Sequence, residues 1–222
     1  MPTLKKIYRS ERQIDRQNTI LKTTRKLVSH VGYDGLRMRV LAEKSGVSPM
    51  TLYNLYSSKD ELLLAALIDL LSELVRSAQV AAAKGFDRIL LYQSIMSEEV
   101  ERSPGYAEAM ARALFQAKPE DRLVNTLLAE PIHQNLVQLV YEKNNGAIHE
   151  GVDPELLAHH ITVQGWGVVL LWNKGLIDLD QVKRETTRSL LMTIIAVCKG
   201  PGSRRYKKRL AELDARWPRL LE

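Results

Sequence analysis

The sequence predicts an all-α protein of about nine to ten helices, and three observations support this fold class. Apolar residues recur with the helical period through most of the chain, and no stretch alternates as a half-buried strand does. Aromatic residues make up only 6% of the 222 residues, which is low for a many-stranded β architecture. Polar residues stand directly before a proline at several points, a pattern that is typical of helix N-termini.

The first three elements lie within the first 56 residues. One apolar stripe predicts a helix over residues 15–31, and the two glycines of Gly32-Tyr33-Asp34-Gly35 end it. A short helix follows over residues 38–44, and Gly46 suits the left-handed turn that closes it. Ser48 can cap the next helix, with Pro49 at its first position. The stripe consists of Ile20, Thr24, Leu27, Val28 and Val31.

The remaining elements form a longer helical body. Ser58 and Glu61 have the spacing of a capping box, so we expect a long helix to begin there. Later helices are expected to start at Ser103-Pro104, Lys118-Pro119 and Asp153-Pro154, and the last helix of the body spans about residues 181–198. In the tail, Tyr206, Leu210, Leu213 and Trp217 share one helix face. We expect this extra helix to dock on the body or on a partner subunit.

Charge is distributed unevenly along the chain. Residues 1–60 carry 12 Lys and Arg against 5 Asp and Glu, residues 61–198 carry 12 against 18, and residues 199–222 carry 8 against 3. A basic head on an acidic body suggests that the head meets a polyanion, although a short segment can also be basic by chance. Residues 1–57, 58–202 and 203–222 are therefore interpreted as a basic head domain, a helical body and a basic C-terminal helix.

Composition also excludes several protein classes. The single cysteine, Cys198, excludes an internal disulfide framework and a multi-cysteine zinc site. No apolar stretch approaches the roughly 18 residues of a membrane span, and the polar N-terminus does not resemble a secretory signal. The sequence lacks a nucleophile elbow, a phosphate loop and metal-ligand spacing. We expect a cytoplasmic protein without membrane contact, without metal or cofactor, and without enzymatic activity.

The first three helices have the arrangement of a helix-turn-helix. In this motif a short turn holds the second helix of the pair outward, so that its N-terminal residues reach base edges in the major groove. Gly46 supplies the turn, and Leu41, Val47 and Leu52 supply the apolar contacts between helices. The outward face consists of Ser48, Pro49, Met50, Thr51 and Asn54.

Residues 35–63 resemble the DNA-binding signature of TetR-type transcriptional regulators. The family pattern of Ala-x-x-x-Gly-Val-Ser, Leu-Tyr and Ser-Lys-x-x-Leu is matched in order and spacing by Ala42 to Ser48, Leu52-Tyr53 and Ser58 to Leu62. The resemblance covers about residues 15–75. It implies that Arg39 reaches a base or a phosphate, that Pro49, Met50 and Thr51 read bases, and that Tyr53 and Lys59 bind phosphates.

This chain departs from the family pattern at a few positions. Arg37 and Met38 stand where the family often has Thr or Ser, so the phosphate contact there can pass to Arg37. Leu55 is assigned no role, and Tyr56 replaces the usual phenylalanine and is expected to pack. A basic lead-in either follows phosphates or is simply solvated; it comprises Lys5, Lys6, Arg9, Arg12, Arg16, Lys22 and Arg25.

The body is expected to provide a homodimer interface, since a palindromic DNA operator is read by paired recognition helices. Two of the late helices are apolar enough to form a four-helix bundle with a second copy, as the resemblance also implies. The alternative is that these helices form only the core of one chain. The predicted interface residues are Leu157, Ile161, Gln164, Gly165, Val168, Leu191, Ile194 and Ile195, on helix faces that also carry Leu156, His160, Gly167, Leu190 and Val197.

The other helices of the body can enclose a mostly apolar cavity for a small-molecule effector. Candidate lining residues are Tyr92, Met96, Met110, Phe115, His133, Trp166 and Trp172, each of which can instead be ordinary core. The leading hypothesis is a ligand-responsive, sequence-specific repressor that binds double-stranded DNA and leaves it when the effector binds. The alternative is a small helical enzyme or a protein-binding adaptor whose basic head is incidental.

Overall fold

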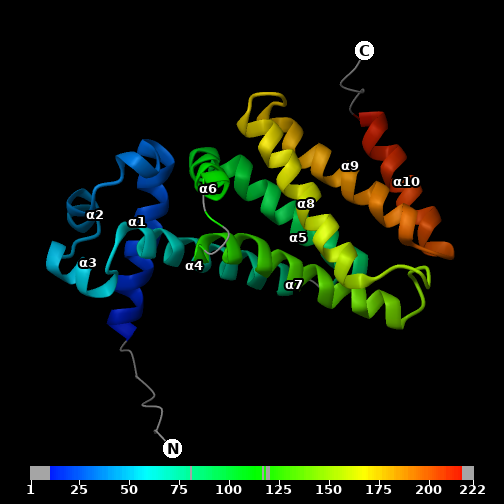
Figure 1. The fold of residues 1–222 in the computed structure, drawn as a ribbon, viewed down its shortest axis with the longest axis horizontal. Helices are drawn as coiled ribbons and strands as arrows, with labels where there is room; N and C mark the ends of the chain where they lie inside the picture. The colour runs from blue at the N-terminus through cyan, green and yellow to red at the C-terminus, as the bar shows by residue number, and fades with distance from the viewer. Residues whose placement is uncertain (1–10, 81, 117, 119–120, 217–222) are drawn as a thin grey trace, which may run out of the picture. The chain divides into compact units, whose positions relative to one another are not determined.

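The structure, a computed structural model, describes residues 11–80, 82–116, 118 and 121–216. Apart from an isolated antiparallel bridge between Ile148 and Cys198, the regular structure in these ranges is helical, which confirms the predicted fold class (Figure 1). The helices are α1 (Glu11–Gly35), α2 (Met38–Lys44), α3 (Pro49–Leu55), α4 (Lys59–Val80), α5 (Gly85–Arg102), α6 (Pro104–Gln116), α7 (Arg122–Asn144), α8 (Pro154–Asn173), α9 (Leu179–Val197) and α10 (Pro201–Arg216).

The chain divides into two compact units, Met1–Leu71 and Ser72–Glu222, so that α4 runs from one into the other. The predicted domain boundaries after residues 57 and 202 lie within two residues of the starts of α4 and α10. The division of the chain into functional domains at these points remains a prediction. No helix in the described ranges is both long and apolar enough to cross a lipid bilayer.

The first unit is organised around one apolar core beneath α1 to α4. Ile20, Leu41, Leu52 and Leu62 are fully buried and belong to the same cluster. Burial of each such side chain contributes about 1.5–3 kcal/mol relative to leaving it in water, so the short helices α2 and α3 are held by packing rather than by their length. Tyr56, predicted to pack, is buried in this cluster.

The predicted helix boundaries in this unit are close to the observed ones. Gly32 interrupts α1 with a φ of 68°, and Gly46 closes α2 with a φ of 67°. Ser48 caps α3 by accepting a hydrogen bond from the Thr51 amide at 3.1 Å. At α4 the Glu61 amide donates to Ser58 Oγ, but the Glu61 carboxylate accepts from the Ser57 amide at 2.8 Å. The predicted capping box is therefore wrong in its second half, because Glu61 reaches one residue further back.

In the second unit, α5, α7, α8 and α9 surround the main core, which includes Phe86, Leu139, Ile161, Leu191 and Ile194. The predicted helix starts at Pro104 and Pro154 are confirmed. The third expected start falls at residues 118–121, where Pro119 lies outside the described residues. There α7 begins at Arg122 after Asp121, whose carboxylate accepts from the Lys118 amide at 2.8 Å.

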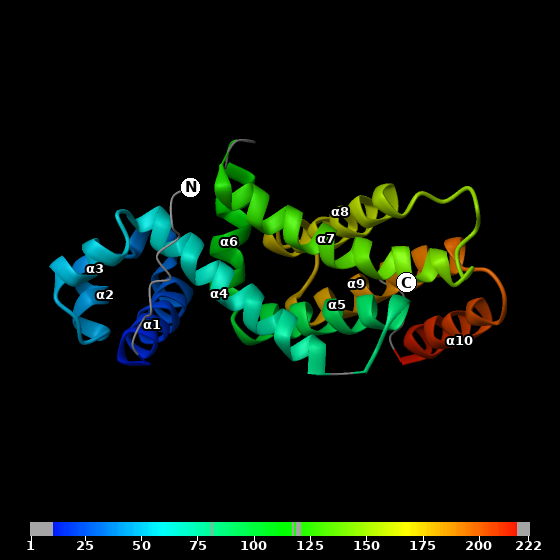
Figure 2. The ribbon, with the colours of Figure 1, turned by 90° about the horizontal axis from the view of Figure 1, so that it is seen from below.

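The predicted C-terminal helix is α10, and it docks on its own chain. Figures 1 and 2 show α10 beside α9. Tyr206 is buried with its ring edge-on to Phe86 of α5 at 5.8 Å, and Arg205 Nη2 lies 2.5 Å from the Asp87 carboxylate. Leu210 and Leu213 pack on the same core, whereas Trp217 lies outside the described residues.

Candidate nucleic-acid interface

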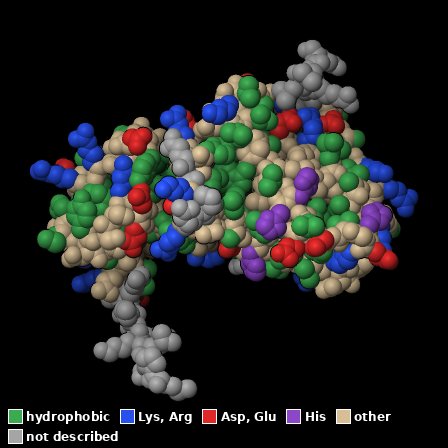
Figure 3. Space-filling view, in the orientation of Figure 1, with side chains coloured by type: hydrophobic (Ala, Val, Ile, Leu, Met, Phe, Trp, Pro, Cys, Tyr) green, Lys and Arg blue, Asp and Glu red, His purple; other side chains and the backbone are tan. Residues whose placement is uncertain are grey.

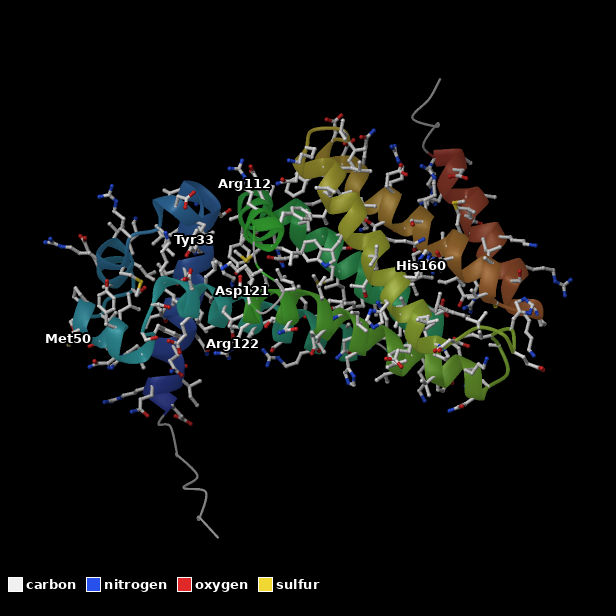
Figure 4. The ribbon with its side chains drawn as sticks, in the orientation of Figure 1. Tyr33, Met50, Arg112, Asp121, Arg122 and His160 are labelled. Atoms are coloured by element: carbon white, nitrogen blue, oxygen red, sulfur yellow. The ribbon has the colours of Figure 1, made fainter. Side chains whose placement is uncertain are left out.

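Helix α3 presents an exposed face at its N-terminal end. Met50, labelled in Figure 4, is 70% exposed and Tyr53 is 51% exposed. Ser48, Pro49 and Asn54 are exposed as well. Thr51 is partly buried, and its hydroxyl lies 2.9 Å from Ser48 Oγ. Because Leu52 points into the core, the polar and small residues of α3 are held outward, in the orientation that major-groove contact requires.

The preceding helix α2 contributes two exposed guanidinium groups. Arg37 is the residue before its first turn and makes no side-chain cap, and Arg39 lies within that turn. Among the described residues, neither guanidinium lies within salt-bridge distance of a carboxylate. Leu41 and Ala42 on the opposite face are fully buried, so α2 presents its charges away from the core. Figure 3 shows Lys and Arg side chains standing out from this part of the surface.

Lys59, in the first turn of α4, is partly buried against an aromatic ring. Its Nζ lies 4.0 Å from the centroid of the Tyr33 ring, and the Tyr33 hydroxyl donates a hydrogen bond to Asp60. Burial and the Asp60 carboxylate raise the pKa of Tyr33 to about 12. Sequence reasoning placed Tyr33 only in a helix break and missed this contact, because its partners lie in another helix and gave no local signal.

The basic lead-in divides into exposed and structural residues. Arg12, Arg16 and Lys22 are exposed on α1, whereas Lys5, Lys6 and Arg9 lie outside the described residues. Arg25 is partly buried, and its Nη1 lies 2.7 Å from the Asp69 carboxylate and 3.2 Å from the Ala66 carbonyl oxygen. Arg25 therefore joins α1 to α4, and neither interpretation of the lead-in, phosphate contact or simple solvation, describes its contacts here.

A small cavity of about 10 Å³ lies in the second unit, between the C-terminal half of α4 and helices α5 and α7. Tyr92 is the predicted effector residue that lines it. The Tyr92 side chain is only 6% exposed, and its buried hydroxyl has no hydrogen-bond partner among the described residues. Burial, together with nearby Glu130, raises the pKa of Tyr92. The full lining is Val75, Ala78, Arg88, Ile89, Tyr92, Gln134, Asn135 and Gln138.

The other predicted effector residues do not line this cavity. Met110 is buried core, Met96 is half-buried, and His133 is exposed. Phe115 is 46% exposed and meets Trp166 edge-on at 6.5 Å. Trp172 packs on a separate cluster of Val168, Ile177 and Val182. The sequence missed the glutamines and the asparagine of the cavity because polar residues on a long helix are usually solvated.

Most of the predicted dimer residues lie in the interior of one chain. The main core contains Leu157, Ile161, Leu191 and Ile194, and the smaller cluster contains Val168. These side chains are buried within one chain and are not exposed for contact with a second copy. Of the remaining three, Ile195 packs partly against the core, Gln164 accepts a hydrogen bond from Thr193 at 3.0 Å, and a Cβ on Gly165 would meet Gln93. Five of the eight predicted residues are thus engaged within one chain, and the location of a dimer interface remains a prediction.

The same two helices also carry an exposed apolar face. On α8 the exposed apolar residues are Leu156, Val163, Leu170 and Leu171, and on α9 Met192 is 58% exposed. His160, marked in Figure 4, and Gly167 are exposed between them at helical spacing. Because α8 is apolar around most of its circumference, periodicity alone could not tell its outward stripe from its inward one.

Comparisons with known proteins bear on the N-terminal helices and on the fold. Residues 20–66 match the family model described as bacterial regulatory proteins, tetR family. The chain is 36% identical over 110 residues to the HTH-type transcriptional repressor KstR of Mycobacterium tuberculosis, covering 47% of this chain and 49% of that protein. It is 33% identical over 109 residues to KstR of Rhodococcus jostii, covering 49% and 51%. The chain thus spans about half the length of the curated relatives it matches.

A solved structure shares the fold over a longer range. A putative TetR-family transcriptional regulator from Rhodococcus sp. superposes with a TM-score of 0.68 at 22% identity, covering 82% of this chain and 99% of that one. At this identity the likeness concerns the fold alone. Both the helix-turn-helix and the helical body thus follow an arrangement already seen in solved structures.

Proposed function

We propose that this chain, which belongs to the TetR family of bacterial transcriptional regulators through its N-terminal domain, is a ligand-responsive repressor that binds a palindromic DNA operator as a homodimer. The observation that carries the proposal is the outward face of α3, with Pro49, Met50 and Tyr53 free to meet DNA. The relatives that match this region are named transcriptional repressors, which supports repression over activation.

DNA recognition divides between bases and phosphates. Met50 offers an apolar contact such as a thymine methyl group, and Thr51, Asn54 and Arg39 can hydrogen-bond to base edges. Tyr53, Arg37 and Lys59 lie on the same unit with polar or charged ends suited to phosphates. Lys59 also lies in the first turn of α4, where the free amides of a helix N-terminus favour an anion.

The exposed apolar face of α8 and α9 supports a homodimer. Leu156, Val163 and Leu170 are each separated from the next by two helical turns, so they lie along one face of α8. A Cβ added to Gly167 would have no neighbouring atom within 4 Å, so the surface there is open. A contiguous apolar surface of this kind is typical of an interaction site, and a second copy would cover it with the same face.

The cavity beside Tyr92 has space for about one water molecule and a largely polar lining, so an effector bound there would have to enlarge it and would carry at least one hydrogen-bond acceptor for the Tyr92 hydroxyl. Val75 and Ala78 of its lining belong to α4, the helix whose first turn carries Lys59. An effector that enlarges this cavity would therefore act on the helix that enters the DNA-binding unit. It releases DNA only if it binds the DNA-incompetent state more tightly than the competent one.

Gel-shift titrations on the DNA next to its own gene, at several salt concentrations, test the function. We expect binding with a steep salt dependence and weaker binding by Arg39→Ala and Lys59→Ala. Removing one cation that binds a phosphate should lower the salt slope by about 0.9. Lys207→Ala, at an exposed cation of α10 in the other unit, serves as a charge-matched comparison and should leave binding unchanged. Absence of binding by the folded wild type would contradict the proposal and favour a protein-binding adaptor or an enzyme.

Native mass spectrometry of the chain purified from its host tests the effector site. We expect a bound small molecule that is retained less by Tyr92→Phe, since losing one neutral hydrogen bond costs roughly a factor of 2 to 10. Tyr141→Phe, at an exposed tyrosine of α7, is the control. Equal retention by both variants would remove Tyr92 from the site.

A further inference from the structure

The contact between Lys59 and Tyr33 joins two segments that sequence reasoning treated separately. Tyr33 follows the kink of α1 at Gly32, and Lys59 opens α4. Both residues and Asp60 lie in the first compact unit, and Figure 4 marks Tyr33 there. The Lys59 ammonium lies over the ring face at 4.0 Å from its centroid, within the range of a cation–π interaction.

Asp60 holds the ring in this place. The Tyr33 hydroxyl donates to the Asp60 carboxylate, so the tyrosine is fixed at one end by a hydrogen bond and meets the lysine with its face. Donation to a carboxylate makes the ring more electron-rich, which strengthens its attraction for a cation.

An unrestrained lysine loses conformational entropy when it binds a phosphate. Ordering such a side chain on binding costs about 0.5–1.5 kcal/mol. A lysine already held against a ring has lost part of this conformational entropy before DNA binds, so binding costs less. Its ammonium keeps donors free, because a ring face occupies no N–H group in a hydrogen bond to a fixed acceptor.

We propose that Tyr33 is a positioning residue for DNA binding, which together with Asp60 holds Lys59 in place for a phosphate of the DNA backbone. This inference rests on the proposed function, since it requires that Lys59 contacts DNA. The inference extends the DNA-binding machinery to a residue outside the helix-turn-helix pair, because the tyrosine at the kink of α1 positions a lysine that binds DNA.

A double-mutant cycle tests the inference, using a 30-base-pair duplex selected from a random library by the wild-type protein. Affinity is measured for wild type, Tyr33→Leu, Lys59→Ala and the double variant. We expect Tyr33→Leu to weaken binding about three- to tenfold in the wild-type background, which is the ordering cost above expressed as affinity. In the Lys59→Ala background the same substitution should change affinity by less than about twofold, because the lysine it positions is absent.

Two further variants separate positioning from a general structural effect. Tyr33→Phe keeps the ring and loses only the bond to Asp60, so its affinity should lie between those of wild type and Tyr33→Leu. Tyr141→Leu removes a similar pair in the other unit, where Lys84 Nζ lies 6.0 Å from the Tyr141 ring, and should leave DNA affinity unchanged. Thermal melting of each variant confirms that it is folded.

The outcomes distinguish this inference from the proposed function. If Lys59→Ala weakens binding but Tyr33→Leu costs the same factor in both backgrounds, Tyr33 acts independently of Lys59 and the inference is wrong. If the folded wild type enriches no duplex, the proposed function fails first. A cost of Tyr33→Leu that disappears with Lys59 supports the inference.

Discussion

The backbone at Gly85 shows how a single residue determines the start of a helix. Its φ is +59°, and its amide donates to Gln138 Oε1 at 3.0 Å, while the next amide, that of Phe86, donates to Glu142 Oε1 at 2.8 Å. Two side chains of α7 thus satisfy the first free amides of α5, a role that a local capping residue usually performs. These partners lie more than 50 residues away along the chain, so no local sequence pattern indicates them.

Gly85→Ala should therefore destabilise the second unit. A Cβ at this position would overlap Glu142 Oε1, and the positive φ disfavours any residue with a Cβ. We expect a loss of about 1–3 kcal/mol in the free energy of unfolding, measured by urea denaturation. Gly151→Ala, at an exposed glycine with nothing within 4 Å, is the matched control and should be nearly neutral. Equal stability of the two variants would contradict this account of α5.

Among the elements, those with a local signal were predicted best. Ser48-Pro49 and Asp153-Pro154 predicted helix starts because capping and the missing proline amide act within one turn. The outward face of α3 followed from Leu52 packing inward. The inward and outward stripes of α8 could not be assigned, since both are apolar and only the neighbouring helices decide between them. The polar cavity and the contact of Tyr33 with Lys59 depend on pairs far apart in sequence.

Helix α10 should stabilise the chain without determining its oligomeric state. It buries Tyr206 against Phe86 of the same chain and adds the pair between Arg205 and Asp87. Deletion of residues 203–222 exposes Phe86, so we expect a melting temperature several degrees lower, from a loss of about 2–5 kcal/mol. Size-exclusion chromatography with light scattering should show an unchanged oligomeric state. Unchanged melting, or a change of oligomeric state, would show that the helix does not act in this way.

The exposed face of α8 should determine the oligomeric state. Val163→Glu places a charge at the centre of that face, and burying an unpaired carboxylate in a dimer is unfavourable by several kcal/mol. We expect a monomer by analytical ultracentrifugation and a parallel loss of operator affinity. Val137→Glu, at a comparably exposed valine of α7, should remain dimeric. A dimer that survives the first substitution and dissociates with the second would place the interface on α7.

At the scale of the whole molecule, α4 is the element that belongs to both units. Its first turn carries Lys59, and its C-terminal half contributes Val75 and Ala78 to the cavity beside Tyr92. A continuous helix of 22 residues offers a direct connection by which events in the body can reach the DNA-binding unit. The proposed repressor thus needs no further element between the effector and the operator, only an effector that distinguishes two positions of this helix.

The most direct test of the central claim is to select duplexes from a random library with the wild-type protein and with Met50→Ala, and to compare the sequences obtained. If α3 reads bases, the wild type should enrich a palindromic motif. Met50→Ala should relax or change the preference at matching positions of both half-sites while retaining salt-sensitive, non-specific binding. An identical motif from both proteins would contradict the claim that this end of α3 reads the major groove, and the absence of any motif would contradict sequence-specific recognition itself.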